Sequence, residues 1–401
     1  MTGMNAVDAT AVKSLEDFSL VNGGPLYRVW RRTGLAGADM QQAHRRVIVA
    51  VLVTWVPLFV LSVLGGRAWG EDGVLSFLDD IESQVRMLVA VPLLLLAEGR
   101  AHQELPAVLR CFVDQGLIPP AQRSRFECAV ASAARLRDSV VAELLLLVLV
   151  YVVGMMIIRR TQFMLDTETW YATVAGGKRV LTPAGWWGAL VAMPLVQFLC
   201  MRWFYRFFIW GRLLWQVSRI PMHLEPTHPD CAGGLHFVAL FERSCRFVMA
   251  AMGVMLSGMI ANRILYTGAG LLDFKVEIIG MVVLLLGMVF GPMFAFTTKM
   301  QAAKHHALEE YGRLGQRYAS EFGSKWFRGG RPGEPLLGSA DIQSLADLRN
   351  GYVVVKDMHW MPFDHSDVVT LAACVLVPLV PLLLTKYSLE EILDRLLKTV
   401  F

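Results

Sequence analysis

The chain has 401 residues, of which 55% are hydrophobic and 18% are charged, and its formal net charge is +4. Soluble domains carry about 25% charged residues, so this composition excludes an ordinary water-soluble protein and indicates lipid as the solvent. The net charge is small and the arginines are sorted by loop, which gives no support to a nucleic-acid partner. The sequence therefore predicts an all-α integral membrane protein.

Seven apolar stretches predict transmembrane helices, because about 20 apolar residues are needed to cross roughly 30 Å of hydrocarbon. They cover residues 47–66, 81–97, 140–158, 184–201, 247–266, 276–298 and 368–385. The second stretch is the least apolar, since Glu82, Arg86 and Glu98 crowd its ends. Without it, the most basic loops would fall on the outer side of the membrane, so the loop charges favour about seven spans.

The loop charges also predict the orientation. Lysines and arginines gather before the first span, between the second and third, around the loop 218–246 and after the sixth span, whereas the loop 67–80 is acidic. Basic loops stay in the cytoplasm. The N-terminus is therefore predicted to be cytoplasmic, and seven spans place the C-terminus on the opposite side.

The chain divides into four parts on this pattern. They are a cytoplasmic N-terminal segment (1–46), spans one to six with cytoplasmic loops 99–139 and 218–246 (47–298), a cytoplasmic helical loop (299–366), and span seven with a C-terminal amphipathic helix (367–401). In the first part, residues 25–32 form a small amphipathic piece suited to the membrane face. In the third, apolar residues at helical spacing over 311–322 predict a projecting helix, and 351–355 a short extended piece.

The loop 224–236 concentrates more side-chain chemistry than any other stretch. His228, Asp230 and His236 are candidate ligands for a divalent, zinc-like metal, which takes about four N, O or S donors. Further donors predicted on the same side are His223, Cys231, His305, His306, His359, Asp364 and His365. The spacing matches no standard zinc pattern. Two alternatives to a metal site remain. The stretch can be a structural loop in which Asp230 caps the following helix, or an anion-binding site near Gly233. No other cofactor is predicted.

Charged residues near the predicted spans are a second set of candidates, because a charge at membrane depth is costly and marks a functional site by default. The candidate polar-path or lipid-headgroup residues are Glu143, Arg202, Arg206, Arg243 and Arg246. Glu143 is the best candidate for a buried role, since it could pair with Arg202 or Arg206. A carboxylate paired with headgroups or solvated at the interface is the alternative.

Prolines and small residues mark further features of the predicted spans. Proline interrupts them at Pro57, Pro92, Pro194, Pro292, Pro378 and Pro381, and broken helices line the sites of many transporters. Gly253-x-x-x-Ser257 and Gly287-x-x-x-Gly291 predict close helix packing.

Three segments of the C-terminal half form a recognisable set: His228-Pro229-Asp230-x-x-Gly233-Gly234-Leu235 and the tail segments 378–382 and 389–393. In these segments the C-terminal half resembles an uncharacterised group of bacterial multi-pass inner-membrane proteins. No function is assigned to that group. The resemblance implies a bacterial inner (plasma) membrane address, in which the C-terminus predicted from the loop charges would lie in the periplasm, and it implies nothing about activity.

Three functions follow as hypotheses. The leading one is transport or conduction of a small solute or ion, from the class of protein and the interrupted helices, with a homo-oligomer as one form. The second is a membrane scaffold or sensor whose basic cytoplasmic surface binds a partner or anionic lipid. The third is a metal-dependent membrane enzyme, the least favoured because no nucleophile elbow, Walker loop or HExxH motif is present.

Overall fold

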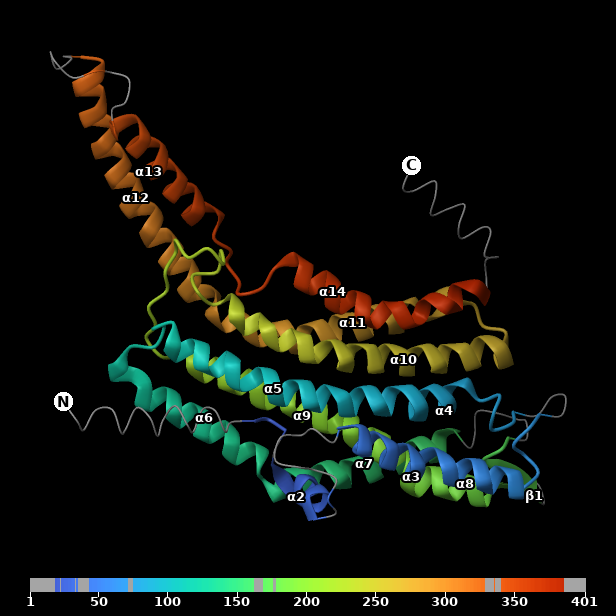
Figure 1. The fold of residues 1–401 in the computed structure, drawn as a ribbon. Helices are drawn as coiled ribbons and strands as arrows, with labels where there is room; N and C mark the ends of the chain where they lie inside the picture. The colour runs from blue at the N-terminus through green and yellow to red at the C-terminus, as the bar shows by residue number, and fades with distance from the viewer. Residues whose placement is uncertain are drawn as a thin grey trace.

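The computed structural model describes residues 19–21, 23–32, 34, 43–70, 75–161, 169–175, 178–328, 335 and 340–385. Within these ranges the regular secondary structure is helical apart from one short hairpin and an isolated bridge between Leu75 and Thr169 (Figure 1). Five helical stretches are long and apolar enough to cross a membrane: Ala43–Leu64, Pro183–Ser218, His236–Thr267, Leu271–Trp326 and His365–Leu384. Val140–Val152 is a shorter apolar helix. The predicted class, an all-α polytopic membrane bundle, is confirmed, while the count of seven spans stays a prediction.

The α-helices follow one another with short connections. They are α2 (Gly24–Arg32), α3 (Ala43–Leu64), α4 (Ile81–Val85), α5 (Val91–Asp114), α6 (Arg123–Arg137), α7 (Val140–Thr161), α8 (Pro183–Trp187), α9 (Met193–Ser218), α10 (Glu242–Thr267), α11 (Lys275–Phe290), α12 (Thr297–Trp326), α13 (Ala340–Asp357) and α14 (His365–Leu376). Short 3-10 or π segments join several of them into longer rods. These are η1 (Arg86–Ala90), η2 (Pro120–Gln122), η3 (Gly188–Ala192), η4 (His236–Phe241), η5 (Leu271–Phe274), η6 (Gly291–Phe296) and η7 (Val377–Thr385).

The long helices run side by side and define two ends of the bundle (Figure 1). We call the end where α5 and α9 terminate and α10 begins the basic end, because arginine-rich connections lie there (Figure 1). The opposite, hairpin end carries β1 (Ala172–Ala175) paired antiparallel with β2 (Lys178–Leu181). The sequence did not predict this hairpin, since four-residue strands are too short to show an alternating pattern.

Apolar side chains cover the outside of the bundle as well as its interior. Those exposed on the outward faces include Ile48, Leu52, Leu144, Leu145, Val148, Ile279 and Val283. The largest fully buried side chains include Trp203, Trp210, Phe77, Phe112, Phe126, Phe241 and Phe296. A large apolar exterior is unfavourable in water and is what a surrounding of lipid tails permits.

The prolines change the helix type without ending the rods. The π turns η1 and η3 lie directly before Val91-Pro92 and Met193-Pro194, respectively. Proline has no N–H to donate and its ring crowds the preceding turn, so a widened turn accommodates it. Pro292, Pro378 and Pro381 lie in the 3-10 segments η6 and η7, whereas Pro57 lies inside the continuous helix α3.

Helices α12 and α13 form an antiparallel pair that extends beyond the basic end (Figure 1). The pair is closed near its tip by Asp341, which accepts hydrogen bonds from Lys325 Nζ at 2.6 Å and Trp326 Nε1 at 3.0 Å. The projecting helix expected over 311–322 is therefore present. The expectation of an extended piece over 351–355 was wrong: helix packing overrides the β-branched run, and Gly351 lies so close to the Tyr311 ring that a Cβ would meet it at 2.9 Å. The C-terminal amphipathic helix falls outside the described residues.

Helix α10 packs closely against α14, as Gly253-x-x-x-Ser257 predicted. A Cβ on Gly253 would lie 2.3 Å from the Val375 carbonyl oxygen. One turn along, Ser257 Oγ donates a hydrogen bond to the Pro378 carbonyl at 2.7 Å. The second predicted motif behaves differently, because a Cβ on Gly287 or Gly291 would meet no described atom within 4 Å.

The substitution Gly253→Ala is therefore expected to push α14 away from α10. Overpacking of this kind lowers the free energy of unfolding by about 1–3 kcal/mol. The matched control is Gly287→Ala, which adds the same methyl group to a helix where no described atom is near and removes a helix-weakening glycine. Thermal unfolding in detergent checks both variants. Equal midpoints for the two would contradict the packing described for α10.

Candidate functional site

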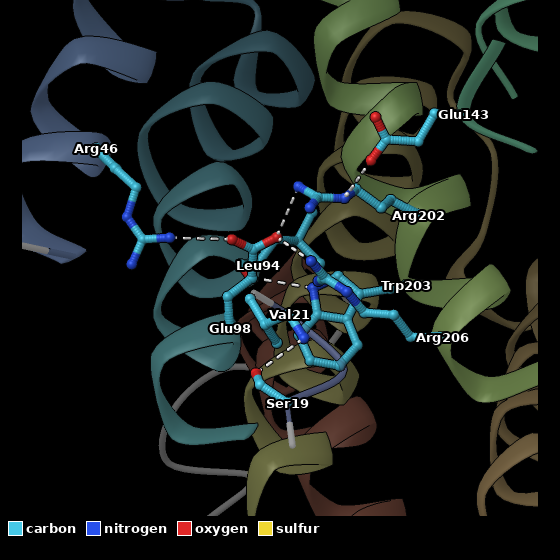
Figure 2. A network of polar contacts seen from close by, with 9 residues as sticks. All are labelled: Ser19, Val21, Arg46, Leu94, Glu98, Glu143, Arg202, Trp203 and Arg206. Atoms are coloured by element: carbon cyan, nitrogen blue, oxygen red, sulfur yellow. Dashed lines mark hydrogen bonds and ion pairs between the residues drawn. The ribbon is translucent and has the colours of Figure 1, made fainter. Parts of the chain in front are cut away.

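Glu98 of α5 is buried at the centre of a cluster of arginines, which Figure 2 shows at close range. Its side chain is 1% exposed. Oε1 accepts hydrogen bonds from Arg206 Nη2 at 2.7 Å and Arg202 Nη1 at 3.4 Å, and Oε2 accepts one from Arg46 Nη1 at 3.2 Å. One carboxylate is thus held by three guanidinium groups from α3 and α9.

The helices bring these charges together because each carries its charge where its apolar stretch ends. Arg46 directly precedes the apolar part of α3, Glu98 follows that of α4–α5, and Arg202 follows that of α8–α9. Helices α5 and α9 run parallel to each other and antiparallel to α3, so the start of α3 lies level with the ends of the two other apolar stretches (Figure 1). The three positions consequently meet at one depth, on the side of the basic end.

Glu143 joins the cluster from the first turn of α7. Its Oε1 lies 3.6 Å from Arg202 Nε, and the side chain is 7% exposed. The structure therefore brings Glu143 together with one of the two arginines that the sequence offered as its partner. Gly24, the first residue of α2, abuts the same carboxylate, since a Cβ there would lie 2.4 Å from Glu143 Oε1.

Two tryptophan rings face the cations of the cluster. Trp30 of α2 lies with its ring centroid 5.2 Å from Arg46 Cζ and 5.7 Å from Arg202 Cζ. Trp203 lies 4.8 Å from Arg206 Cζ. The negative face of an aromatic ring stabilises a cation most where water is excluded, as here. The amphipathic segment 25–32 thus lies against the charge cluster, whereas the sequence suggested a place on the membrane surface.

The cluster holds more positive than negative charge. Three guanidinium groups and two carboxylates carry a formal net charge of +1. Three buried guanidinium nitrogens also have no hydrogen-bond partner among the described residues: Nε and Nη2 of Arg46 and Nη1 of Arg206. A buried donor without a partner costs about 1–3 kcal/mol, more when it is charged, so the cluster has unused capacity for an anion.

A second buried carboxylate, Asp80, lies at the hairpin end and is satisfied without a cation. It caps α4 through Ser83 N, and it also accepts hydrogen bonds from Ser83 Oγ, Trp170 Nε1 at 2.9 Å and Asn262 Nδ2 at 2.7 Å. These bonds link α4 to α10 and to the segment before β1. The arrangement explains Asn262 in an apolar helix as a structural donor.

Asp230 organises the loop 224–236 through the backbone. Its carboxylate accepts hydrogen bonds from the N–H groups of Ala232 at 2.9 Å, Gly234 at 3.1 Å and His236 at 3.1 Å, so it caps the turn that leads into η4. Burial alone raises the pKa of Asp230, but these three donors and His228 outweigh it and hold the pKa below its ordinary value. Gly233 and Gly234 have φ values of 65° and 88°, which glycine adopts freely.

The metal candidates are only partly brought together. His228 Nδ1 lies 2.8 Å from Asp230 Oδ1, whereas His236 reaches Asp230 through its backbone N–H. His359 pairs with Asp364 at 2.7 Å. The described part of the chain contains no group of three or more His, Cys, Asp and Glu side chains placed to hold a metal. The divalent metal therefore stays a prediction from the sequence.

The remaining sequence candidates lie apart from the cluster. Arg243 and Arg246 are exposed at the start of α10, and Arg246 Nε pairs with Glu242 at 2.9 Å. Sequence reasoning missed the two residues that complete the cluster: Glu98 was noted for weakening a span and Arg46 for orienting the first. The signal that could have found them is their shared position, since each stands where an apolar stretch meets a basic loop.

Comparison of the chain with protein-family models, with curated proteins and with solved structures gives no match. The resemblance of the C-terminal half to bacterial inner-membrane proteins accordingly stays a prediction, and the site has to be interpreted from its own geometry.

Removing the charge of Glu98 tests whether the cluster works as one unit. Glu98→Gln leaves the three arginines facing one carboxylate, and breaking a buried ion pair lowers the free energy of unfolding by about 3–5 kcal/mol. Arg206→Gln added to Glu98→Gln removes one of the unbalanced charges. Arg206→Gln should therefore lower the free energy of unfolding by at least about 1 kcal/mol less in the Glu98→Gln protein than in the wild type. Chemical unfolding of the four proteins in detergent measures the coupling, and strictly additive losses would contradict a shared cluster.

The cap at Asp230 is expected to depend on pH. Asp230→Ala loses three backbone hydrogen bonds and should lower the free energy of unfolding by about 1–2 kcal/mol near neutral pH. Because the pKa is lower in the folded chain, the stabilisation is complete above the unfolded value of about 3.9 and is lost as the pH falls through the folded value. Melting midpoints of both proteins between pH 6 and pH 3 check this. A gap that stays constant at acidic pH would contradict it.

Proposed function

We propose that this chain is a bacterial inner-membrane protein that transports or conducts a small solute or ion, with the Glu98 cluster on the path. The observation that carries the proposal is a set of five charged side chains, buried between helices at the level where the apolar stretches end, with more guanidinium than carboxylate groups. Charges in such places are costly, and they mark pathways for ions and polar solutes.

The spacing of the two polar layers supports a crossing by α4–α5. An α-helix rises about 1.5 Å per residue, so the segment from Asp80 to Glu98 is about 27 Å long, close to the thickness of the hydrocarbon core. Within this interval the residues from Met87 to Ala97 are all apolar, and Glu82, Ser83, Gln84 and Arg86 lie in its first part, near Asp80. We infer that this rod crosses the membrane as the second span in chain order and completes the set of seven. The basic end and the N-terminus then lie in the cytoplasm and the C-terminus in the periplasm.

The interrupted helices support movement along this path. The π turns η1 and η3 lie in α4–α5 and α8–α9, the two rods that also supply Glu98, Arg202 and Arg206. Arg86, the first residue of η1, donates from Nη1 to Sδ of Met193, the first residue after η3, at 3.1 Å. Widened turns before proline are frequent at functional sites, because their backbone groups are less firmly paired than in a regular helix.

A membrane scaffold is the second candidate, favoured by the pair α12–α13. This pair extends from the basic end, away from the bundle, and presents exposed Leu314, Ile342 and Phe327 (Figure 1). Exposed arginines, among them Arg243, lie at the same end, where they can meet anionic lipid. Such a scaffold would bind a partner protein or lipid and pass no solute.

Ion flux through purified, reconstituted protein separates the two candidates. The wild type in phosphatidylcholine vesicles is expected to carry current under gradients of potassium chloride, acetate or phosphate. Arg206→Gln should reduce the largest of these currents at least tenfold, because about 1.4 kcal/mol lost at a desolvated charge already gives that factor. Solid-supported membrane electrophysiology measures it.

The matched control is Arg212→Gln, on the same helix as Arg206. Arg212 is partly buried and donates to Ser132 Oγ at 2.9 Å, outside the Glu98 cluster. Its substitution should leave the current within about twofold of the wild type. Vesicles that pass none of the three salts, or equal loss in the two variants, would contradict transport through the cluster and favour the scaffold.

A further inference from the structure

The edge of the Arg46 guanidinium that is turned from Glu98 carries two buried donors that bind nothing in the described part of the chain. Nη1 donates to Glu98 Oε2, whereas Nε and Nη2 are both buried and have no hydrogen-bond partner among the described residues. These two nitrogens form one edge of the planar guanidinium, with two N–H bonds directed alike. Such a fork matches the two oxygens of a carboxylate or a phosphate.

Burial makes it unfavourable to leave the two donors on this edge of Arg46 without a hydrogen-bond acceptor. The Arg46 side chain is 1% exposed, and the Trp30 ring lies 5.2 Å from its Cζ atom. Arg206 Nη1, on the other flank of Glu98, is a third buried donor without a partner (Figure 2). The formal charge of +1 on the five side chains favours binding of a negative charge there.

Glu98 shows which chemistry the arginines accept. Its carboxylate takes hydrogen bonds from all three guanidinium groups and is the one negative charge in direct contact with Arg46 and Arg206 in the described residues. A second oxyanion on the Arg46 edge would lie near that carboxylate and be repelled by it. Three cations around the site offset this repulsion, so affinity should rise when Glu98 is made neutral.

We propose that the Glu98 cluster binds a small oxyanion, a carboxylate or a phosphate group, on the Nε–Nη2 edge of Arg46 beneath Trp30. This inference rests on the proposed function in one respect, that the bound anion belongs to the class of solute that is moved. The same chemistry is offered by a free anion and by the phosphate of a lipid headgroup.

Binding is tested on the purified full-length chain in phosphatidylcholine nanodiscs, through the shift of the melting midpoint with anion concentration. Potassium phosphate or acetate should raise the midpoint more than potassium chloride at equal ionic strength, because a spherical ion does not use both donors of the edge. Arg46→Lys keeps the charge and loses the planar edge, so the apparent Kd for the oxyanion should rise at least about tenfold. Arg212→Lys is the matched control and should respond as the wild type does.

A second variant works in the opposite direction. Glu98→Gln adds one unit to the positive charge of the cluster and should lower the apparent Kd, provided it folds. The wild-type preference for oxyanions over chloride needs no variant. The proposal would be overturned by a wild type that melts alike in potassium chloride, phosphate and acetate and alike in nanodiscs of phosphatidylcholine and of phosphatidylglycerol. An Arg46→Lys protein whose response is unchanged would also overturn it.

Lipid composition separates the two sources of the oxyanion. If nanodiscs of phosphatidylglycerol raise the midpoint of the wild type but not of Arg46→Lys, while soluble phosphate and acetate do nothing, the site is supported with a lipid headgroup as its ligand. Binding without current in vesicles would leave this site standing and remove transport. Current that Arg206→Gln reduces, in a protein without oxyanion preference, would leave transport standing and remove this site.

Discussion

Burial of Glu98 among three arginines sets a constraint that the remaining contacts of the bundle have to satisfy. Each of these charges would be too costly to bury alone, so α3, α5 and α9 must keep the register that pairs them. Apolar contacts impose no such condition, because lipid tails replace a neighbouring helix at little cost. The ion cluster thus selects one vertical alignment of helices that could otherwise slide, and the close α10–α14 packing at Gly253 is compatible with that alignment.

Asp80, which caps α4, and Glu98, on α5, are both buried carboxylates, and the fold compensates the cost of their burial in two different ways. Asp80 is surrounded by neutral donors that match its lone pairs, which makes it a structural joint between α4, α10 and the segment before β1. Glu98 is surrounded by cations whose donors outnumber its lone pairs, so part of their capacity is left over. Only the Glu98 cluster therefore retains hydrogen-bond donors with which it can bind a further anion. This difference, rather than burial alone, is why function is assigned to the basic end.

Sequence patterns predicted those features that depend on neighbours along the chain. Apolar stretches indicated the class of fold, and helical spacing predicted the projecting helix α12. The position of Asp230 predicted its capping role. The cluster was only half predicted, through Glu143 and its arginines, because its centre depends on which helices are neighbours. Glu98 lies 52 residues from Arg46 and 108 from Arg206. No periodicity encodes such pairings, and local β propensity over 351–355 was misleading for the same reason, since packing against α12 decided it.

The N-terminal helix α2 acquires a role from these contacts that its amphipathic sequence did not suggest. Gly24 touches the Glu143 carboxylate, and Trp30 faces both Arg46 and Arg202, so one short helix contacts charges from α3, α7 and α9. An aromatic face laid over guanidinium groups excludes water and strengthens every electrostatic interaction beneath it. The same coverage means that an oxyanion can reach the open edge of Arg46 from this side only if Trp30 gives way. Access to the cluster and its stability are therefore set by the same helix.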